Sequence, residues 1–144
     1  KSIVRNNTAI YNGTINYATI ENSVVVANTV IGLNDSIIQW NDGIFNSGLF
    51  GTNKNHNNVY ATWSGGIFNG GEFINNGKWE NGTFNGGKFL SSYGWTQSTS
   101  VISGVGYGWE NGVFNGGEFG NAELGSNSTW YDGEFNGGTF KGRV

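Results

Sequence analysis

The stretch WENGTFNGGKF, Trp79 to Phe89, carries a large aromatic residue at every fifth position. A period of five matches neither the 3.6-residue turn of an α-helix nor the two-residue alternation of a simple strand. Glycine at this density would also destabilise a helix by about 1 kcal/mol per site. The stretch therefore predicts a coiled, all-β backbone in which each five-residue unit forms one short side and points its aromatic ring inward.

The same pattern recurs along most of the chain. Four near-copies also begin with Trp and end with Phe: Trp40–Phe50, Trp63–Phe73, Trp109–Phe119 and Trp130–Phe140. Aliphatic residues keep the five-residue step in the N-terminal part, with one interruption at Asp35. We expect the following residues to form the structural core: Ile10, Ile15, Ile20, Val25, Val30, Trp40, Phe45, Phe50, Trp63, Phe68, Phe73, Trp79, Phe84, Phe89, Trp109, Phe114, Phe119, Leu124, Trp130, Phe135 and Phe140.

The positions around each inward residue are also patterned. A small residue, most often glycine, stands two places earlier, and side chains at i and i+2 of an extended chain point the same way. We therefore expect the small residue to leave room for the ring, and the residue between them, such as Thr83 or Lys88, to point outward. Corners are expected at the Asn-Gly and Gly-Gly pairs, which accept positive φ. Asparagines that directly follow an inward Phe are predicted to form a hydrogen-bonded ladder between coils: Asn46, Asn69, Asn85, Asn115 and Asn136.

Composition limits the possible functions. The chain has 144 residues, the size of one domain, with 26 glycines and 23 asparagines. Charged residues make up 12% and the net charge is −3, which argues against the basic patches that bind nucleic acid. No apolar run approaches the roughly 20 residues of a membrane span. Because the sequence contains no methionine, we expect it to be a fragment of a longer protein.

We interpret residues 1–144 as a single repeat domain. Aliphatic-to-aromatic coils are expected at 8–50, and aromatic coils at 61–89 and 109–140. Residues 51–60 are expected to form a protruding polar loop, and residues 90–108 an irregular insertion rich in Ser and Gly. Four of the aromatic residues that lie outside the five-residue inward positions are candidates for surface binding: Tyr60, Tyr93, Trp95 and Tyr107.

The sequence contains no recognisable catalytic set. His56 is the single histidine and stands in a polar stretch, and there is no cysteine, so we predict no metal site and no cofactor. Asp42 and Asp132 occupy the corner position where other repeats have Asn, which turn chemistry explains. We therefore expect a protein that is not an enzyme.

The pattern of a small residue, any residue and a large apolar residue every five positions resembles the pentapeptide-repeat proteins. The triplets AEL (Ala122–Leu124) and ATI (Ala18–Ile20) carry the resemblance most directly. It implies a right-handed, four-sided β-solenoid with about four five-residue units per coil. This chain differs in using Gly, Phe and Trp, and its grouping in triplets leaves three sides open as an alternative. The aromatic-glycine units are also similar to repeats in bacteriophage tail-fibre and other virion surface proteins.

These features suggest a non-catalytic structural repeat module of a virion or cell-surface fibre, located outside the cell or on the virion. Such a module would mediate assembly and attachment, through self-association or packing against other structural chains. One alternative is a glycan-binding adhesin domain that uses the off-grid aromatics. Others are a pentapeptide-repeat interaction module, with DNA mimicry disfavoured by the mixed charges, and an ice-binding protein with rows of threonines.

Overall fold

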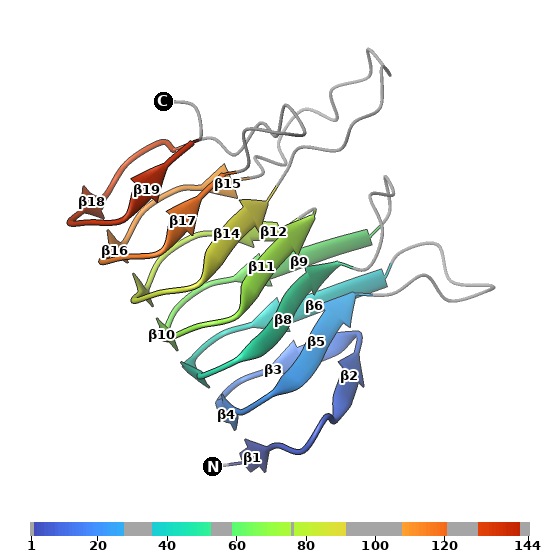
Figure 1. Cartoon of the computed structure of the whole chain (residues 1–144). Coiled ribbons are helices and arrows are strands. Elements are labelled where there is room, and N and C mark those ends of the chain that lie inside the picture. The colour runs from blue at the N-terminus through green and yellow to red at the C-terminus, as the bar shows by residue number, and fades with distance from the viewer. Residues whose placement is uncertain are drawn as a thin grey trace.

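The computed structural model describes residues 2–27, 36–52, 59–75, 77–91, 108–120 and 130–141. Across these ranges the chain forms nineteen β-strands and no helix, arranged in three parallel sheets (Figure 1). The strands stack in coils from β1 at one end to β18 and β19 at the other. The prediction of an all-β, solenoid-like repeat fold is therefore confirmed.

Each complete coil contributes one strand to each sheet. Sheet A contains β1 (Ser2–Val4), β4 (Ala18–Ile20), β7 (Gly43–Phe45), β10 (Ile67–Phe68), β13 (Thr83–Phe84), β16 (Val113–Phe114) and β18 (Glu134–Phe135). Sheet B contains β2 (Ala9–Tyr11), β5 (Ser23–Ala27), β8 (Gly48–Thr52), β11 (Glu72–Asn75), β14 (Lys88–Ser91), β17 (Glu118–Phe119) and β19 (Thr139–Phe140). Sheet C contains β3 (Gly13–Ile15), β6 (Ser36–Trp40), β9 (Val59–Trp63), β12 (Gly77–Trp79) and β15 (Gly108–Trp109), and a bridge from Trp109 extends it to Trp130.

The coil has three sheets, not the four sides that the resemblance to pentapeptide repeats implies. The reason is that each Trp-Phe-Phe triplet supplies one inward residue to each of sheets C, A and B in turn. Equivalent positions are separated by 15 residues from Ile10 to Val25, which is three five-residue sides, and by 16 residues from Asn69 to Asn85, where one residue is added. The triplet grouping in the sequence therefore corresponds to the architecture.

Like residues stack on like residues because the parallel strands are in register. In sheet C the ring centroids of Trp40, Trp63 and Trp79 are separated by 4.6 and 5.0 Å, and their planes differ by 7°. In sheet A the rings of Phe68 and Phe84 lie 4.7 Å apart. Rings of different stacks meet edge to face, the other favourable arrangement of aromatic pairs. The interior is thus three parallel columns of stacked rings.

The inward residues are fully buried in the middle of the solenoid but not at its ends. No side chain from Trp40 to Phe119 in the three columns exceeds 0% exposure: Trp40, Phe45, Phe50, Trp63, Phe68, Phe73, Trp79, Phe84, Phe89, Trp109, Phe114 and Phe119. Phe135 and Phe140, expected in the core, are 37% and 38% exposed because no described coil covers them. Ile10, Ile15 and Trp130 are only partly buried for the same reason. Val30 and Leu124 lie outside the described residues.

The glycine two places before an inward ring does not mainly make room for that ring, which corrects the sequence interpretation. Gly43 has φ of +129°, and a Cβ there would collide with the backbone of Ala18 in the preceding coil. The close approach of successive backbones therefore requires glycine. Gly77 is different, because a Cβ there would lie 3.0 Å from two atoms of the Phe73 ring. At that position glycine does make room for a ring, but for the preceding inward ring and not, as the sequence pattern suggested, for Trp79.

The gaps in the described residues occur at one corner of the coil. Each internal gap follows a strand of sheet B and precedes a residue of sheet C: 28–35, 53–58, 76, 92–107 and 121–129. Residues 51–60 were expected to form a loop, but Gly51–Thr52 belong to β8 and Val59–Tyr60 belong to β9. Leu90–Ser91 likewise belong to β14. Apart from one extra residue between Val4 and Ile10 in the first coil, length variation is therefore confined to the corner between sheets B and C.

Candidate functional site

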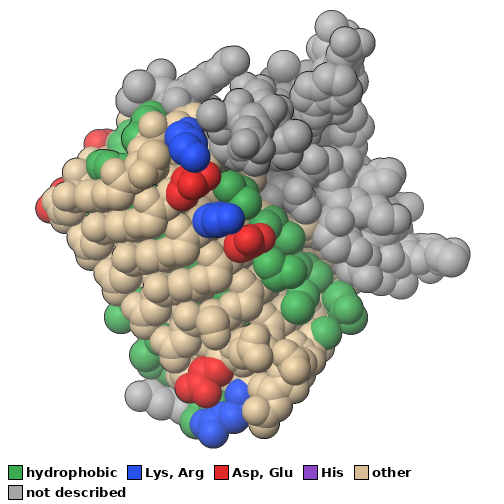
Figure 2. Space-filling model, viewed as in Figure 1, with side chains coloured by type: hydrophobic (Ala, Val, Ile, Leu, Met, Phe, Trp, Pro, Cys, Tyr) green, Lys and Arg blue, Asp and Glu red, His purple; other side chains and the backbone are tan. Residues whose placement is uncertain are grey.

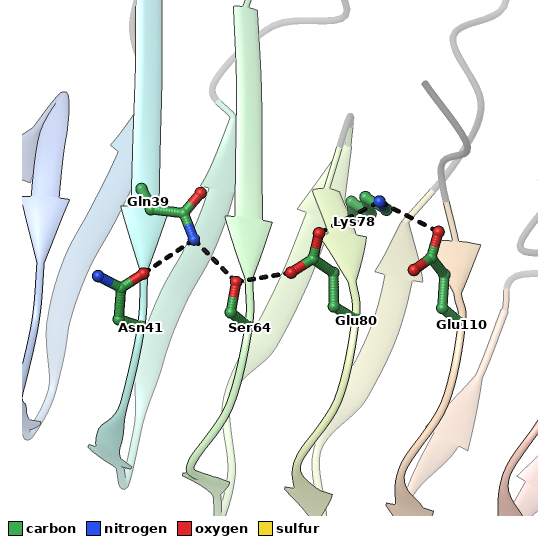
Figure 3. A network of polar contacts seen from close by, with 6 residues as sticks. All are labelled: Gln39, Asn41, Ser64, Lys78, Glu80 and Glu110. Carbon is green, nitrogen blue, oxygen red and sulfur yellow. Dashed lines mark hydrogen bonds and ion pairs between the residues drawn. The ribbon is translucent and has the colours of Figure 1, made fainter. Parts of the chain in front are cut away.

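Polar side chains form a continuous row on the outer surface along sheet C (Figure 3). We call it the polar row, and it comprises Gln39, Asn41, Ser64, Lys78, Glu80 and Glu110. Each of the six directly follows an inward Trp or precedes it by one place, so strand alternation turns it outward. The register of the parallel strands then aligns them from coil to coil. The polar row joins side chains of four successive coils and of several residue types.

Hydrogen bonds connect the N-terminal half of the polar row. The side-chain amide of Gln39 donates to Oδ1 of Asn41 at 3.0 Å and to Oγ of Ser64 at 2.8 Å. The Ser64 hydroxyl donates in turn to Oε2 of Glu80 at 2.7 Å. Each of these side chains is hydrogen-bonded to the next across three coils, and the bonds hold the side chains in one arrangement.

Ion pairs connect the C-terminal half. The Nζ atom of Lys78 lies 3.2 Å from Oε1 of Glu80 and 3.1 Å from Oε1 of Glu110. Partial burial by itself would lower the pKa of Lys78, but the hydrogen bonds and charges of Glu110 and Glu80 raise it above its ordinary value of 10.5. Lys78 is therefore a firmly charged group between two carboxylates.

Glu80 is held ionised by the same contacts. Partial burial alone would raise the pKa of Glu80, but the hydrogen bonds from Ser64 and Lys78 and the charge of Lys78 outweigh this effect. The pKa of Glu80 therefore lies below its ordinary value of 4.5. Neither Glu80 nor Lys78 has the pKa near neutrality that suits a general acid or base.

The predicted asparagine ladder is confirmed along the corner between sheets A and B. The side-chain amide of each asparagine donates to Oδ1 of its counterpart in the preceding coil, at 2.8–2.9 Å. The ladder runs through Asn46, Asn69, Asn85, Asn115 and Asn136. Because a member such as Asn85 both donates and accepts, a carboxylate cannot replace it without losing a donor.

The corner between sheets C and A follows a different rule. Asn81 and Asn111 accept a hydrogen bond from the backbone N–H of the next glycine, at 2.8 and 2.7 Å. Asp42 and Asp132 make the same contact at 2.7 and 2.8 Å. An acceptor alone is sufficient here, which explains why both residue types occur at this corner.

Acidic and basic side chains alternate on the outer face of sheet B (Figure 2). The register places Lys88 between Glu72 and Glu118 on neighbouring strands. Lys141 forms a further ion pair with Glu118 at 3.2 Å. Opposite charges on adjacent strands favour the observed register and discourage slippage, so this pattern has a structural explanation.

The candidate binding aromatics lie at or within the gaps of the described chain. Tyr60 is in β9, where its backbone pairs with Ile37, and its side chain is not described. Tyr93, Trp95 and Tyr107 lie outside the described residues, as do His56 and Asp35. All of these binding candidates therefore stay predictions.

The sequence reasoning missed three exposed tyrosines. Tyr11, Tyr17 and Tyr131 are 57%, 37% and 60% exposed. Tyr131 was predictable, because a residue directly after an inward Trp must point outward when side chains alternate along the chain. It stands in the position of Glu110 one coil further on.

The described residues form neither a metal-binding cluster nor a membrane-spanning helix. Within the described ranges no three residues of the His, Asp and Glu types lie close enough to hold a metal ion. None of the described residues belong to a helix able to span a membrane. Comparison of the chain with protein-family models, curated proteins and solved structures found no match. The functional argument therefore depends on the geometry of this molecule.

Proposed function

We propose that the chain is a non-catalytic structural repeat module of a virion or cell-surface fibre, which assembles end to end with other structural chains. We further propose that it is a right-handed, three-sheet variant of the pentapeptide-repeat solenoid, located outside the cell or on a virion. The small-x-large pattern and the five-residue sides support the relation to pentapeptide repeats. Glycine with positive φ in place of alanine is the main departure.

The observation that supports the proposal is the exposed apolar edge of the last described coil, which a further coil of the same protein or of another chain would cover. Inside the solenoid every ring is covered on both sides, as Phe114 is by Phe84 and Phe135. Phe135 has a ring on one side only and is 37% exposed, and Phe140 is 38% exposed. Sheets A and B also end at this coil, with strands β18 and β19. Among the described residues, each of these two strands has one edge without a pairing strand. Apolar rings beside free strand edges favour association with a further coil.

The first coil offers a surface of compatible chemistry. Val4, Ile10 and Ile15 are inward aliphatic residues that are only partly buried. Aliphatic residues already pack on aromatic ones within the molecule, since Ile20 pairs in register with Phe45 and Val25 with Phe50. Contact between the first coil of one chain and the last coil of another would reuse this packing and extend a fibre.

Matched variants test the proposal by light scattering and electron microscopy of the purified chain. Phe135 at the end and Ile67 on the lateral face of sheet A are 37% and 38% exposed. We expect the wild type and Ile67→Ser to form rods that lengthen with concentration, and Phe135→Ser to stay monomeric. A wild type that is monomeric at all concentrations, or assembly abolished only by Ile67→Ser, would contradict end-to-end assembly.

A further inference from the structure

The polar row continues into an exposed aromatic ring. The residue after the inward Trp is Glu80 in one coil, Glu110 in the next and Tyr131 in the one after. Adjacent parallel strands lie about 4.8 Å apart, so Tyr131 is the immediate neighbour of Glu110. The Tyr131 side chain is 60% exposed, the most exposed of the large hydrophobic residues described. The packing of the fold does not require an exposed aromatic side chain next to polar side chains that are paired with one another.

Backbone hydrogen bonds hold this surface in a fixed geometry. The backbone N–H groups of Glu80, Glu110 and Tyr131 donate to the carbonyl oxygens of Trp63, Trp79 and Trp109, at 2.8, 2.7 and 2.9 Å. These bonds fasten each outward residue to the coil below it. A ligand binding here would order few additional groups, which lowers the entropic cost of binding.

The polar groups retain unused hydrogen-bonding capacity. Lys78 contacts Oε1 of Glu110, and a carboxylate has a second oxygen that can accept further hydrogen bonds. The ammonium group of Lys78 has three hydrogens and contacts two carboxylates. Carboxylate acceptors and an ammonium donor together match the hydroxyl groups of a sugar, each of which both donates and accepts.

We propose that Tyr131, Glu110 and Lys78 form a binding site for a neutral oligosaccharide. The apolar face of a sugar ring packs on the exposed phenol ring of Tyr131, and the hydroxyl groups bind Glu110 and Lys78. Glu80, Lys78 and Glu110 together carry one net negative charge, which disfavours an anionic chain. The polar row runs along the solenoid, so a linear sugar chain can extend from Tyr131 across successive coils.

Calorimetric titration of the full chain tests this site with named probes. The neutral probes are cellohexaose, chitohexaose and maltohexaose, and the anionic probe is hexagalacturonate. We expect at least one neutral hexasaccharide to bind and hexagalacturonate not to bind. Absence of binding to all three neutral probes, or preference for hexagalacturonate, would overturn the proposal.

Two tyrosine variants locate the site. Tyr131→Ala should weaken binding by about tenfold, the change that corresponds to 1.4 kcal/mol. Tyr11→Ala is the matched control, because Tyr11 is 57% exposed but lies in sheet B, away from the polar row, and it should bind like the wild type. Equal affinities of Tyr131→Ala and the wild type, with unchanged urea midpoints, would reject the site. Glu110→Gln keeps an acceptor at this position and should weaken binding less than Tyr131→Ala does.

Discussion

The aliphatic coils of residues 2–27 and the aromatic coils that follow share one register but build their corners differently. Ser23 in β5 pairs with Gly48 in β8, so the two positions are equivalent. In the aromatic coil the left-handed residue is Gly48 itself, with φ of +121°, whereas in the aliphatic coil it is Asn22, with φ of +44°. The left-handed residue has therefore moved by one position, and Ser23 can keep a side chain where Gly48 cannot.

This difference shows which features the solenoid needs. Parallel pairing continues from Val25 to Phe50 across the junction of the two regions, so the columns accept aliphatic and aromatic residues alike. What the aromatic coils need in addition is glycine at the corner and full coverage of each ring.

Removal of a fully covered ring should have the largest effect. Phe84 stacks between Phe68 and Phe114 and is 0% exposed, so Phe84→Ala should lower the free energy of unfolding by about 3–5 kcal/mol. Phe135→Ala, with one stacking partner and 37% exposure, should cost about 1–2 kcal/mol. Urea denaturation followed by tryptophan fluorescence measures both. Equal losses would show that coverage by neighbouring coils does not determine stability.

Substitution of a corner glycine should have the next largest effect. Gly87 has φ of +97°, and a Cβ there would meet the Gly71 backbone, so Gly87→Ala should cost about 2–4 kcal/mol. Gly13 is the matched control, because its φ of +110° is equally left-handed but a Cβ there meets nothing within 4 Å. Gly13→Ala should therefore show only the backbone strain. A larger loss for Gly13→Ala would refute the account of close backbone approach.

Conversion of asparagine to aspartate separates the two corner types. Asn85→Asp removes a donor from the ladder and places a charge between two amides, so we expect a loss of about 1–3 kcal/mol at pH 7. Asn81→Asp keeps the acceptor for the Gly82 N–H, as Asp42 does for Gly43, and should change stability by less than about 0.5 kcal/mol. Urea midpoints of the two variants provide the comparison. Similar midpoints would mean that the ladder contributes nothing specific.

The dependence of stability on pH should show the smallest effect. The pKa of Glu80 is lowered, so its contribution is present above 4.5 and is lost as the pH falls below that value. The pKa of Lys78 is raised, so its contribution is present below 10.5 and is lost as the pH rises further. Both groups are partly exposed, and we expect Glu80→Gln to cost less than about 1 kcal/mol between these limits. A cost that does not decrease as the pH falls below 4.5 would contradict the ion-pair explanation.

The five-residue grid was sufficient to predict the central part of the fold. It identified the inward positions from Trp40 to Phe119, because one large apolar residue per side leaves little choice of core residue. It did not predict the exposure of Phe135 and Phe140, which depends on what covers the last coil and not on local sequence. The role of glycine was misinterpreted at Gly43, because the close contact is with the backbone of the preceding coil and not with the Phe45 ring.

Less of the candidate site was predictable. The asparagine ladder follows from one residue type repeated at one position, and the sequence reasoning found it. The polar row uses Gln39, Ser64, Lys78 and Glu110, which share no residue type, so only the register of the strands reveals that they are neighbours. Tyr131 was missed because the search for binding aromatics was confined to segments outside the repeat.

Cysteine cross-linking tests the central claim, the register that stacks one coil on the next. The chain has no cysteine, so paired substitutions give an unambiguous signal. Thr83 and Val113 are register partners in sheet A, and neighbouring strands lie within the range that a disulfide spans. Under mild oxidation Thr83→Cys/Val113→Cys should form an intramolecular disulfide, while Thr83→Cys/Glu118→Cys, which joins different sheets, should not. Failure of the first pair to cross-link, or equal cross-linking of both pairs, would contradict the stacked solenoid.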